Sequence, residues 1–245
     1  QSGSFVKVNL IGDVTFRQYD EEDDGKTAID DYNDDHPGQE LTFVLPRDHR
    51  QWTGSVEVEY NRRGYNVTGS GSWSGRSEWE PFGPYDLASD TAVVFDPATG
   101  TYVPGEPQGL QESFSPFGLA AAKEWYVAGF QKLRAEIDWL DGTDLDRFSR
   151  YQFSLFGNDR LNGFSGTGVR FDDGWIARAG YSFNLFEAVR FDAALENAWV
   201  REREAERQSF TGIGLGANVV GPWKTVISFS YGYALAFDIP ELEGE

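Results

Sequence analysis

The chain alternates large apolar residues with small or polar ones at a period of two, and this constrains its fold more than any other feature. The clearest example is 223–237, where aromatic and aliphatic residues occupy one face for longer than the ~9–11 residues that a tilted membrane strand needs. The other face is small and polar and carries one charge, Lys224. A soluble sandwich would turn charged residues outward, so the pattern favours a strand between lipid and a polar lumen.

The same alternation predicts strands along most of the chain. They lie at 5–17, 55–61, 65–73, 131–139, 175–185, 189–199 and 211–219, with weaker candidates at 41–45, 117–128, 148–156 and 165–172. Gly118–Tyr126 would also fit a helix, but Gly129 and the strand after it favour a hairpin. Because single-chain bacterial barrels have even strand numbers, we expect about twelve strands. The predicted fold is all-β: one antiparallel up-and-down transmembrane β-barrel domain spanning residues 1–245.

The connections between these strands alternate in length. Arg62–Gly64, Glu187–Ala188 and Val220–Pro222 are tight, whereas 20–40 and 80–115 are predicted to be long loops rich in acidic residues, Pro and Gly. Short turns at one rim and long loops at the other are typical of outer-membrane barrels. Tryptophans near strand ends predict an aromatic girdle at the membrane interface, with the core of a soluble sandwich as the alternative: Trp52, Trp73, Trp79, Trp125, Trp139, Trp175, Trp199 and Trp223.

Charge and composition exclude several classes of function. The net charge of −19 argues against nucleic-acid binding, which needs a basic face. There is no Cys, so disulfides and thiolate sites are excluded, and no run of about 18 apolar residues predicts a membrane helix. The absence of Met fits a processed chain or an excised domain. We expect the lipid bilayer of the bacterial outer membrane as partner, with other membrane or periplasmic proteins as further candidates.

Charged residues on the polar faces of the predicted strands are candidates for lining a lumen. Glu57 and Glu59 share one strand face and would fit a pore lining or a glycosidase-like carboxylate pair. A lumenal charge network is the favoured reading, because several arginines are expected on the same side. The predicted lumen-lining residues are Arg17, Glu57, Glu59, Arg134, Glu136, Arg178, Arg190 and Asp192.

The sequence does not predict an enzyme, and it implies no cofactor other than a candidate calcium ion. The two histidines, His36 and His49, lie in predicted loops, and no G-x-S-x-G element occurs. Asp20, Glu22, Asp24 and Asp31 occupy positions 1, 3, 5 and 12 of the calcium-loop template, although position 12 should be Glu. A calcium site that orders 20–35 is therefore one hypothesis, and a solvated acidic loop is the other.

The second half of the chain, about 141–236, resembles the C-terminal barrel region of the Omp85 superfamily of outer-membrane assembly and translocation proteins. The residues that carry the resemblance are Asp144–Phe148, Phe156–Phe164 and the Gly-rich strand 211–217. In that family an Arg-Gly-Phe/Tyr loop folds into the lumen. The resemblance implies this role for Arg160, Asn162, Gly163 and Phe164, with Asn162 standing where the family has Arg. Family barrels have sixteen strands, which this chain is too short to form.

Three functions follow as hypotheses. The first is an outer-membrane barrel that acts as a pore, translocation or anchoring subunit. The second is a plugged structural barrel whose long loops hold a partner protein. The third is a soluble, secreted β-sandwich that serves as a binding module.

Overall fold

The computed structural model describes residues 4–19, 24–38, 40–96, 98–127, 129, 131–154, 159–185, 188–202, 206–221 and 225–237. This part of the chain forms fifteen strands and one helix. Among the described residues, no helix combines the length and the apolar character needed to span a membrane. The fold is all-β with antiparallel sheets, as the alternation predicted, although the strands exceed the expected dozen.

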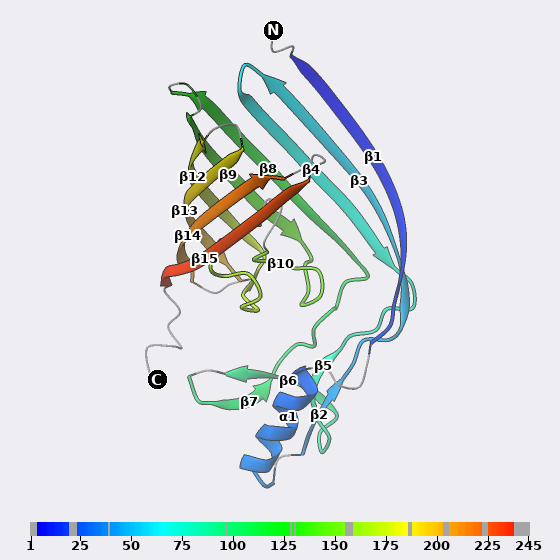
Figure 1. Cartoon of the computed structure of the whole chain (residues 1–245). Helices are drawn as coiled ribbons and strands as arrows, with labels where there is room; N and C mark the ends of the chain where they lie inside the picture. Colours follow the sequence, from blue (N-terminus) through cyan, green and yellow to red (C-terminus); the bar gives the residue numbers. More distant parts are fainter. Residues whose placement is uncertain are drawn as a thin grey trace.

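Nine long strands form one curved sheet in which each strand is antiparallel to its neighbours (Figure 1). Tight connections such as the Arg63–Gly64 turn, with φ of 48° and 78°, join consecutive strands at the rim we call the short-turn end. The predicted strand at 117–128 is confirmed, since Gly118–Tyr126 lies in β8 and not in a helix. In sheet order the strands are β1 (Phe5–Arg17), β3 (His49–Arg62), β4 (Tyr65–Arg76), β8 (Ser113–Tyr126), β9 (Gln131–Thr143), β12 (Asp173–Leu185), β13 (Val189–Arg201), β14 (Gln208–Val220) and β15 (Val226–Phe237).

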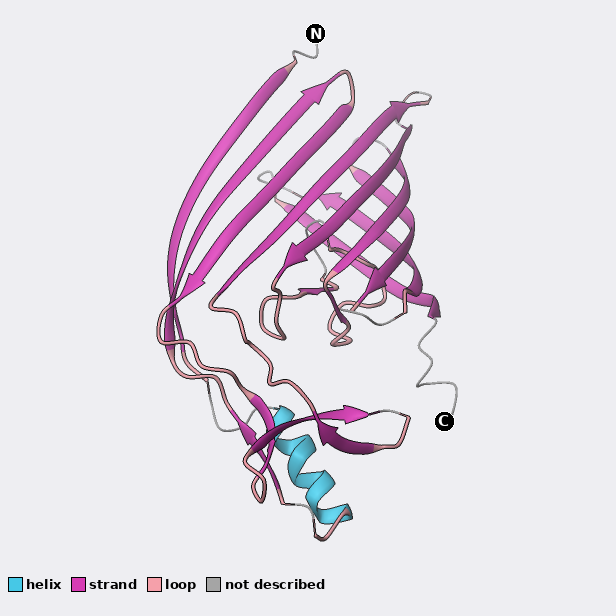
Figure 2. Cartoon of the chain, turned by 180° about the vertical axis from the view of Figure 1, so that it is seen from behind, coloured by secondary structure: helices cyan, strands magenta, loops and turns pink. Residues whose placement is uncertain are grey.

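The two segments predicted as long loops contain regular structure, so that prediction is wrong in this respect. Figure 2 shows α1 (Asp24–Asp35) beside a small sheet of β2 (Leu41–Val44), β5 (Gly83–Asp86), β6 (Thr91–Asp96) and β7 (Thr101–Pro104), beyond the opposite rim, the long-loop end. Ile29 and Tyr32, three residues apart on α1, are buried against Leu41 and Val93. The helix needs only these two apolar residues, because the small sheet supplies the rest of the core. Two apolar residues in an acidic segment are too few to give a helical period in the sequence.

Exposure alternates along the strands of the large sheet. In β3 the side chains of Val56, Val58 and Tyr60 are exposed on one face, while Glu57 and Glu59 are half-buried on the other. The register carries this alternation from strand to strand, so all nine strands share an apolar outer face and a polar inner face. The inner face is the concave one (Figure 1).

Residues 144–172, which we call the inner segment, fold against the inner face of β9, β12, β13 and β14. The described part of the segment contributes Phe153, Leu161, Phe164 and Phe171 to a core. The rest of this core comes from the nine strands of the large sheet, which we call the wall strands: Leu140, Ile176, Ala198, Val200 and Phe210. The strands predicted at 148–156 and 165–172 are therefore not wall strands. Their described residues contain only the two-residue strands β10 (Tyr151–Gln152) and β11 (Arg170–Phe171), because the apolar residues there fill a core and do not face outward.

Candidate functional site

The inner face carries a buried charge network centred on Arg178. Its guanidinium donates to the carboxylates of Asp138 and Glu136, the latter at 2.7 Å, and to the Arg160 carbonyl oxygen at 2.6 and 3.1 Å. Asp138 and Glu196 are fully buried. The Glu196 carboxylate also contacts the inner segment. It accepts a hydrogen bond from the Asn162 backbone N–H at 2.6 Å and lies 3.4 Å from the Arg160 Nε. The network thus ties the inner segment to three wall strands.

Glycines in β14 and β15 let this part of the inner segment lie directly on the wall. A Cβ on Gly212 would collide with the Asn162 carbonyl oxygen, and one on Gly232 would lie 2.6 Å from the Gly163 nitrogen. Gly163 itself has φ +86°, and a Cβ there would strike the backbone of β15, including the Tyr233 carbonyl oxygen at 2.8 Å. The glycines of the wall therefore form a seat, a surface on which the backbone of Asn162 and Gly163 packs directly. Only residues without a side chain permit this close backbone approach.

The other predicted lumen-lining residues face inward. Arg134 joins the Arg178 network through Glu136, and the others lie apart from it. Near the short-turn end Arg134 pairs with Glu124 and Glu136, and Arg190 pairs with Asp192 at 2.7 Å. Arg134, Arg190 and Asp192 border a cavity of about 450 Å³ beside Arg160 and Asn162. Glu57 and Glu59 lie on β3, away from the Arg178 network. Their carboxylates accept hydrogen bonds from nearby side-chain amides, those of Asn9 at 3.1 Å and Asn66 at 3.0 Å.

A second anchor holds the base of the inner segment at the long-loop end. Arg76, the last residue of β4, makes a two-pronged ion pair with Asp146, and both side chains are almost fully buried. Asp146 Oδ1 also accepts the backbone N–H groups of Phe148 and Ser149 at 3.0 and 3.1 Å, which shapes the turn. Sequence reasoning missed Arg76 as a partner, because the pair joins residues seventy positions apart.

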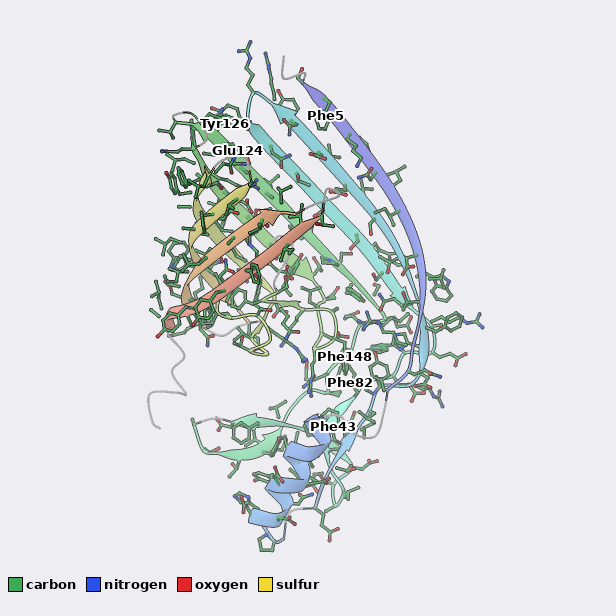
Figure 3. The ribbon with its side chains drawn as sticks, viewed as in Figure 1. Phe5, Phe43, Phe82, Glu124, Tyr126 and Phe148 are labelled. Carbon is green, nitrogen blue, oxygen red and sulfur yellow. The ribbon has the colours of Figure 1, made fainter. Side chains whose placement is uncertain are left out.

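Aromatic rings surround this ion pair. Phe148 packs on Phe82 at 5.1 Å between ring centroids and on Tyr19 at 4.9 Å, and Figure 3 shows Phe82 and Phe148 together between the large sheet and the small one. Trp79 is buried in this group, 4.8 Å from the His49 ring. The girdle prediction is therefore wrong for Trp79, which lies beyond β4 where the chain turns into the small sheet.

The Tyr151 hydroxyl connects the inner segment to β8 and β9 by hydrogen bonds. Its hydroxyl lies 2.9 Å from the carbonyl oxygens of both Phe117 and Asp141, which oppose each other across the two strands. Desolvation by burial raises the pKa of the Tyr151 hydroxyl above its ordinary value. The group therefore remains a hydrogen-bond donor throughout the neutral range.

The Arg76–Asp146 pair gives a direct test of the base anchor. Replacing Asp146 with Asn should destabilise the fold by about 3–5 kcal/mol, because it leaves the Arg76 guanidinium buried without its counter-charge. The free energy of unfolding in detergent would be measured by denaturant titration. Asp144→Asn is the matched control, since this carboxylate two residues away has no ion pair among the described residues. Equal stability of the two variants would contradict the anchor.

The calcium hypothesis falls largely on residues that the structure does not describe. Asp20 and Glu22 lie outside the described residues, and Asp24 and Asp31 belong to α1, so the template's second half is a helix and not a loop. Within the described part of the chain, no three His, Asp or Glu side chains are grouped so as to hold a metal ion. Calcium binding stays a prediction, which calorimetry with millimolar Ca²⁺ would test.

Neither histidine lies beside an array of catalytic groups in the described structure. His36 stacks on Tyr32 and its Nδ1 lies 3.0 Å from the Tyr32 carbonyl oxygen. His49 is buried, with Nδ1 3.0 Å from the Arg47 carbonyl oxygen. Both rings thus have packing partners that account for their positions.

The outer face of the large sheet carries many exposed, large apolar side chains. In β3 two arginines, Arg50 and Arg62, bracket the outward residues from Trp52 to Tyr60, a span of nine residues that matches the ~9–11 residues of a membrane strand. In β9 and β12–β15 the outward positions between the two rims are also uncharged among the described residues. They include these exposed side chains: Leu133, Ile137, Tyr181, Phe191, Leu195, Leu215, Phe229, Tyr231 and Tyr233.

Tryptophans border this apolar band at the long-loop end. Trp139, Trp175 and Trp199 are direct cross-strand neighbours, and the first two rings stack at 5.9 Å. Trp52 and Trp73 continue the border on β3 and β4, each about half-exposed. Trp125 is exposed near the short-turn end, and Trp223 lies outside the described residues. Six of the eight predicted tryptophans are thus on the outer face.

The sequence matches no protein-family model, and comparison with curated proteins finds no match.

Proposed function

We propose that this chain forms the wall of a transmembrane β-barrel in a bacterial outer membrane, where it acts as a pore, translocation or anchoring subunit. The observation that carries the proposal is the apolar, aromatic-bordered band on the outer face of nine consecutive strands. The outward Lys123 of β8 lies near the short-turn end, where its ammonium group donates to the Arg63 carbonyl oxygen at 2.8 Å. Soluble monomers rarely expose contiguous apolar patches larger than about 300–600 Å². A soluble sandwich would also bury its large apolar face, whereas here the face that carries the charged residues is the concave one.

The edges of the sheet indicate how such a barrel would close. Eight successive antiparallel pairings separate β1 from β15, so these two edge strands run in the same direction. Direct closure would join them in parallel, whereas antiparallel closure needs one additional strand, or another odd number of them. An open edge in hydrocarbon is costly because each unsatisfied backbone group costs several kcal/mol. Both edges would therefore be paired in the membrane.

The inner segment favours a second candidate, the plugged structural barrel. Its Arg160–Phe164 stretch lies on the inner face, where the resemblance to the Omp85 superfamily implied a lumenal loop. Phe156–Asn158 of that motif lie outside the described residues. Two buried ion-pair anchors and a seat of glycines would hold a plug in place, and the small sheet with α1 would provide a docking platform beyond the rim.

Membrane insertion is tested by extraction and heat-modifiable mobility. We expect the protein to partition into detergent-extracted outer membranes and to migrate faster on a gel when unheated than when boiled. A protein recovered in the soluble fraction without detergent, with one mobility before and after boiling, would contradict the proposal.

Planar-bilayer conductance separates the two barrel candidates. Steady channels from the unmodified protein would favour an open pore, and a silent bilayer would favour the plugged barrel. A variant with a displaced inner segment then serves as the comparison, since it should conduct if the segment is what blocks the lumen.

A further inference from the structure

A cavity of about 510 Å³ lies where β1 and β3 reach the long-loop end. Its walls combine two kinds of group. Phe16 and Trp52 are outward residues at the border of the apolar band, 68% and 45% exposed. Arg17, Asp48, Arg50 and Glu78 bring charges to the same cavity. The cavity thus joins the lipid-facing surface to a polar recess at the level of the tryptophan border.

The two arginines of this cavity have no ion-pair partner among the described residues. Arg50 extends over the Phe16 ring, 5.1 Å from its centroid. The Nε of Arg17 is buried without a hydrogen-bond acceptor, and His49, which pairs with Arg17 across β1 and β3, is 5% exposed with its Nε2 also unpartnered. Because His49 Nδ1 donates to the Arg47 carbonyl oxygen, Nε2 of the neutral ring is an acceptor, and the unsatisfied buried donor here is the Arg17 Nε. Buried donors without acceptors are rare in folded proteins, so the guanidinium groups of Arg17 and Arg50 make this recess suited to an oxyanion.

The cavity also carries negative charge, which limits the kinds of ligand that its walls would complement. Asp48 uses Oδ1 to accept the Tyr19 backbone N–H at 3.1 Å, and among the described residues no cation pairs with Asp48 or Glu78. Two cations and two carboxylates give the walls no net charge. An anionic ligand would meet the carboxylates unfavourably, whereas a ligand bearing one charge of each sign would complement both groups.

We propose that this cavity binds the headgroup of a zwitterionic phospholipid with a primary ammonium group, a phosphoethanolamine lipid. Arg17 and Arg50 would hold the phosphate, Asp48 and Glu78 would accept the ammonium, and Phe16 and Trp52 would contact the glycerol and the first acyl carbons. The inference rests on the proposed membrane insertion and names one lipid that the membrane wall would retain.

Native mass spectrometry of protein released from nanodiscs tests this site. In nanodiscs with equal amounts of phosphoethanolamine and phosphoglycerol lipids, the unmodified protein should retain the first in preference. The double variant Arg17→Gln/Arg50→Gln should lose this preference, with retention reduced about tenfold, because two charge-assisted contacts are removed. Arg47→Gln is the matched control: this exposed arginine pairs with Glu80 at 2.7 Å outside the cavity and should retain lipid normally.

The outcomes separate the inference from the function on which it rests. Equal retention of both lipids by the unmodified protein, or unchanged retention by the double variant, would overturn the headgroup site while leaving membrane insertion intact. Displacement of the lipid by water-soluble phosphoethanolamine at similar concentration would show a site for the free headgroup and overturn the lipid assignment. Failure of the protein to enter nanodiscs at all would overturn both proposals.

Discussion

Gly163→Ala should release the inner segment from the wall. Two costs add at this position: about 1–2 kcal/mol for an alanine at a left-handed φ of +86°, and about 1–3 kcal/mol for the collision of its Cβ with the β15 backbone. The summed destabilisation approaches the cost of breaking a buried ion pair. We expect a lower denaturation midpoint in detergent, faster proteolysis within 144–172, and new conductance if the segment plugs the lumen.

Gly166 provides the control for this experiment. It lies three residues later with a similar φ of +79°, but a Cβ there would meet no atom within 4 Å. Gly166→Ala should therefore show only the conformational cost and leave the inner segment protected from protease. Similar proteolysis of the two variants would mean that close approach of Gly163 to β15 does not hold the segment.

Val56→Arg should destabilise the protein in a bilayer by about 2–4 kcal/mol, the cost of an arginine near the membrane midplane on the lipid face of a barrel. Val56 is 47% exposed and lies midway between Trp52 and Tyr60. In a soluble protein, the same substitution at so exposed a position would change stability by only about 0.5 kcal/mol. The measurement is the free energy of unfolding from lipid vesicles, compared with unmodified protein.

Ser55→Arg, one residue away, should have a much smaller effect. Ser55 faces inward and borders a cavity of about 470 Å³ together with Glu57, which can accept the new guanidinium. The two variants carry the same charge and differ only in the face of β3 that receives it. A larger cost at Ser55 than at Val56 would place lipid on the wrong face of the sheet and refute the proposed membrane orientation.

The sequence alone determined the wall strands and their two faces. Alternation is a property of neighbouring residues, so each of the strands from β12 to β15 can be recognised without knowing its partners. The same pattern placed Arg178, Arg190 and Asp192 on the inner face, because side chains on a strand point alternately to opposite sides. In the structure, the register of β12 and β13 puts these three residues on one face of the sheet.

Only the tertiary structure decided what fills and borders the sheet. The Arg76–Asp146 pair, the approach of Asn162 to Gly212 and the packing of α1 on the small sheet all join residues far apart in the chain. Such contacts leave no periodic signal, since each depends on the path of the backbone between them. For the same reason a segment with strand-like apolar residues became a core beneath the wall, and the direction of the edge strands emerged only from counting paired neighbours.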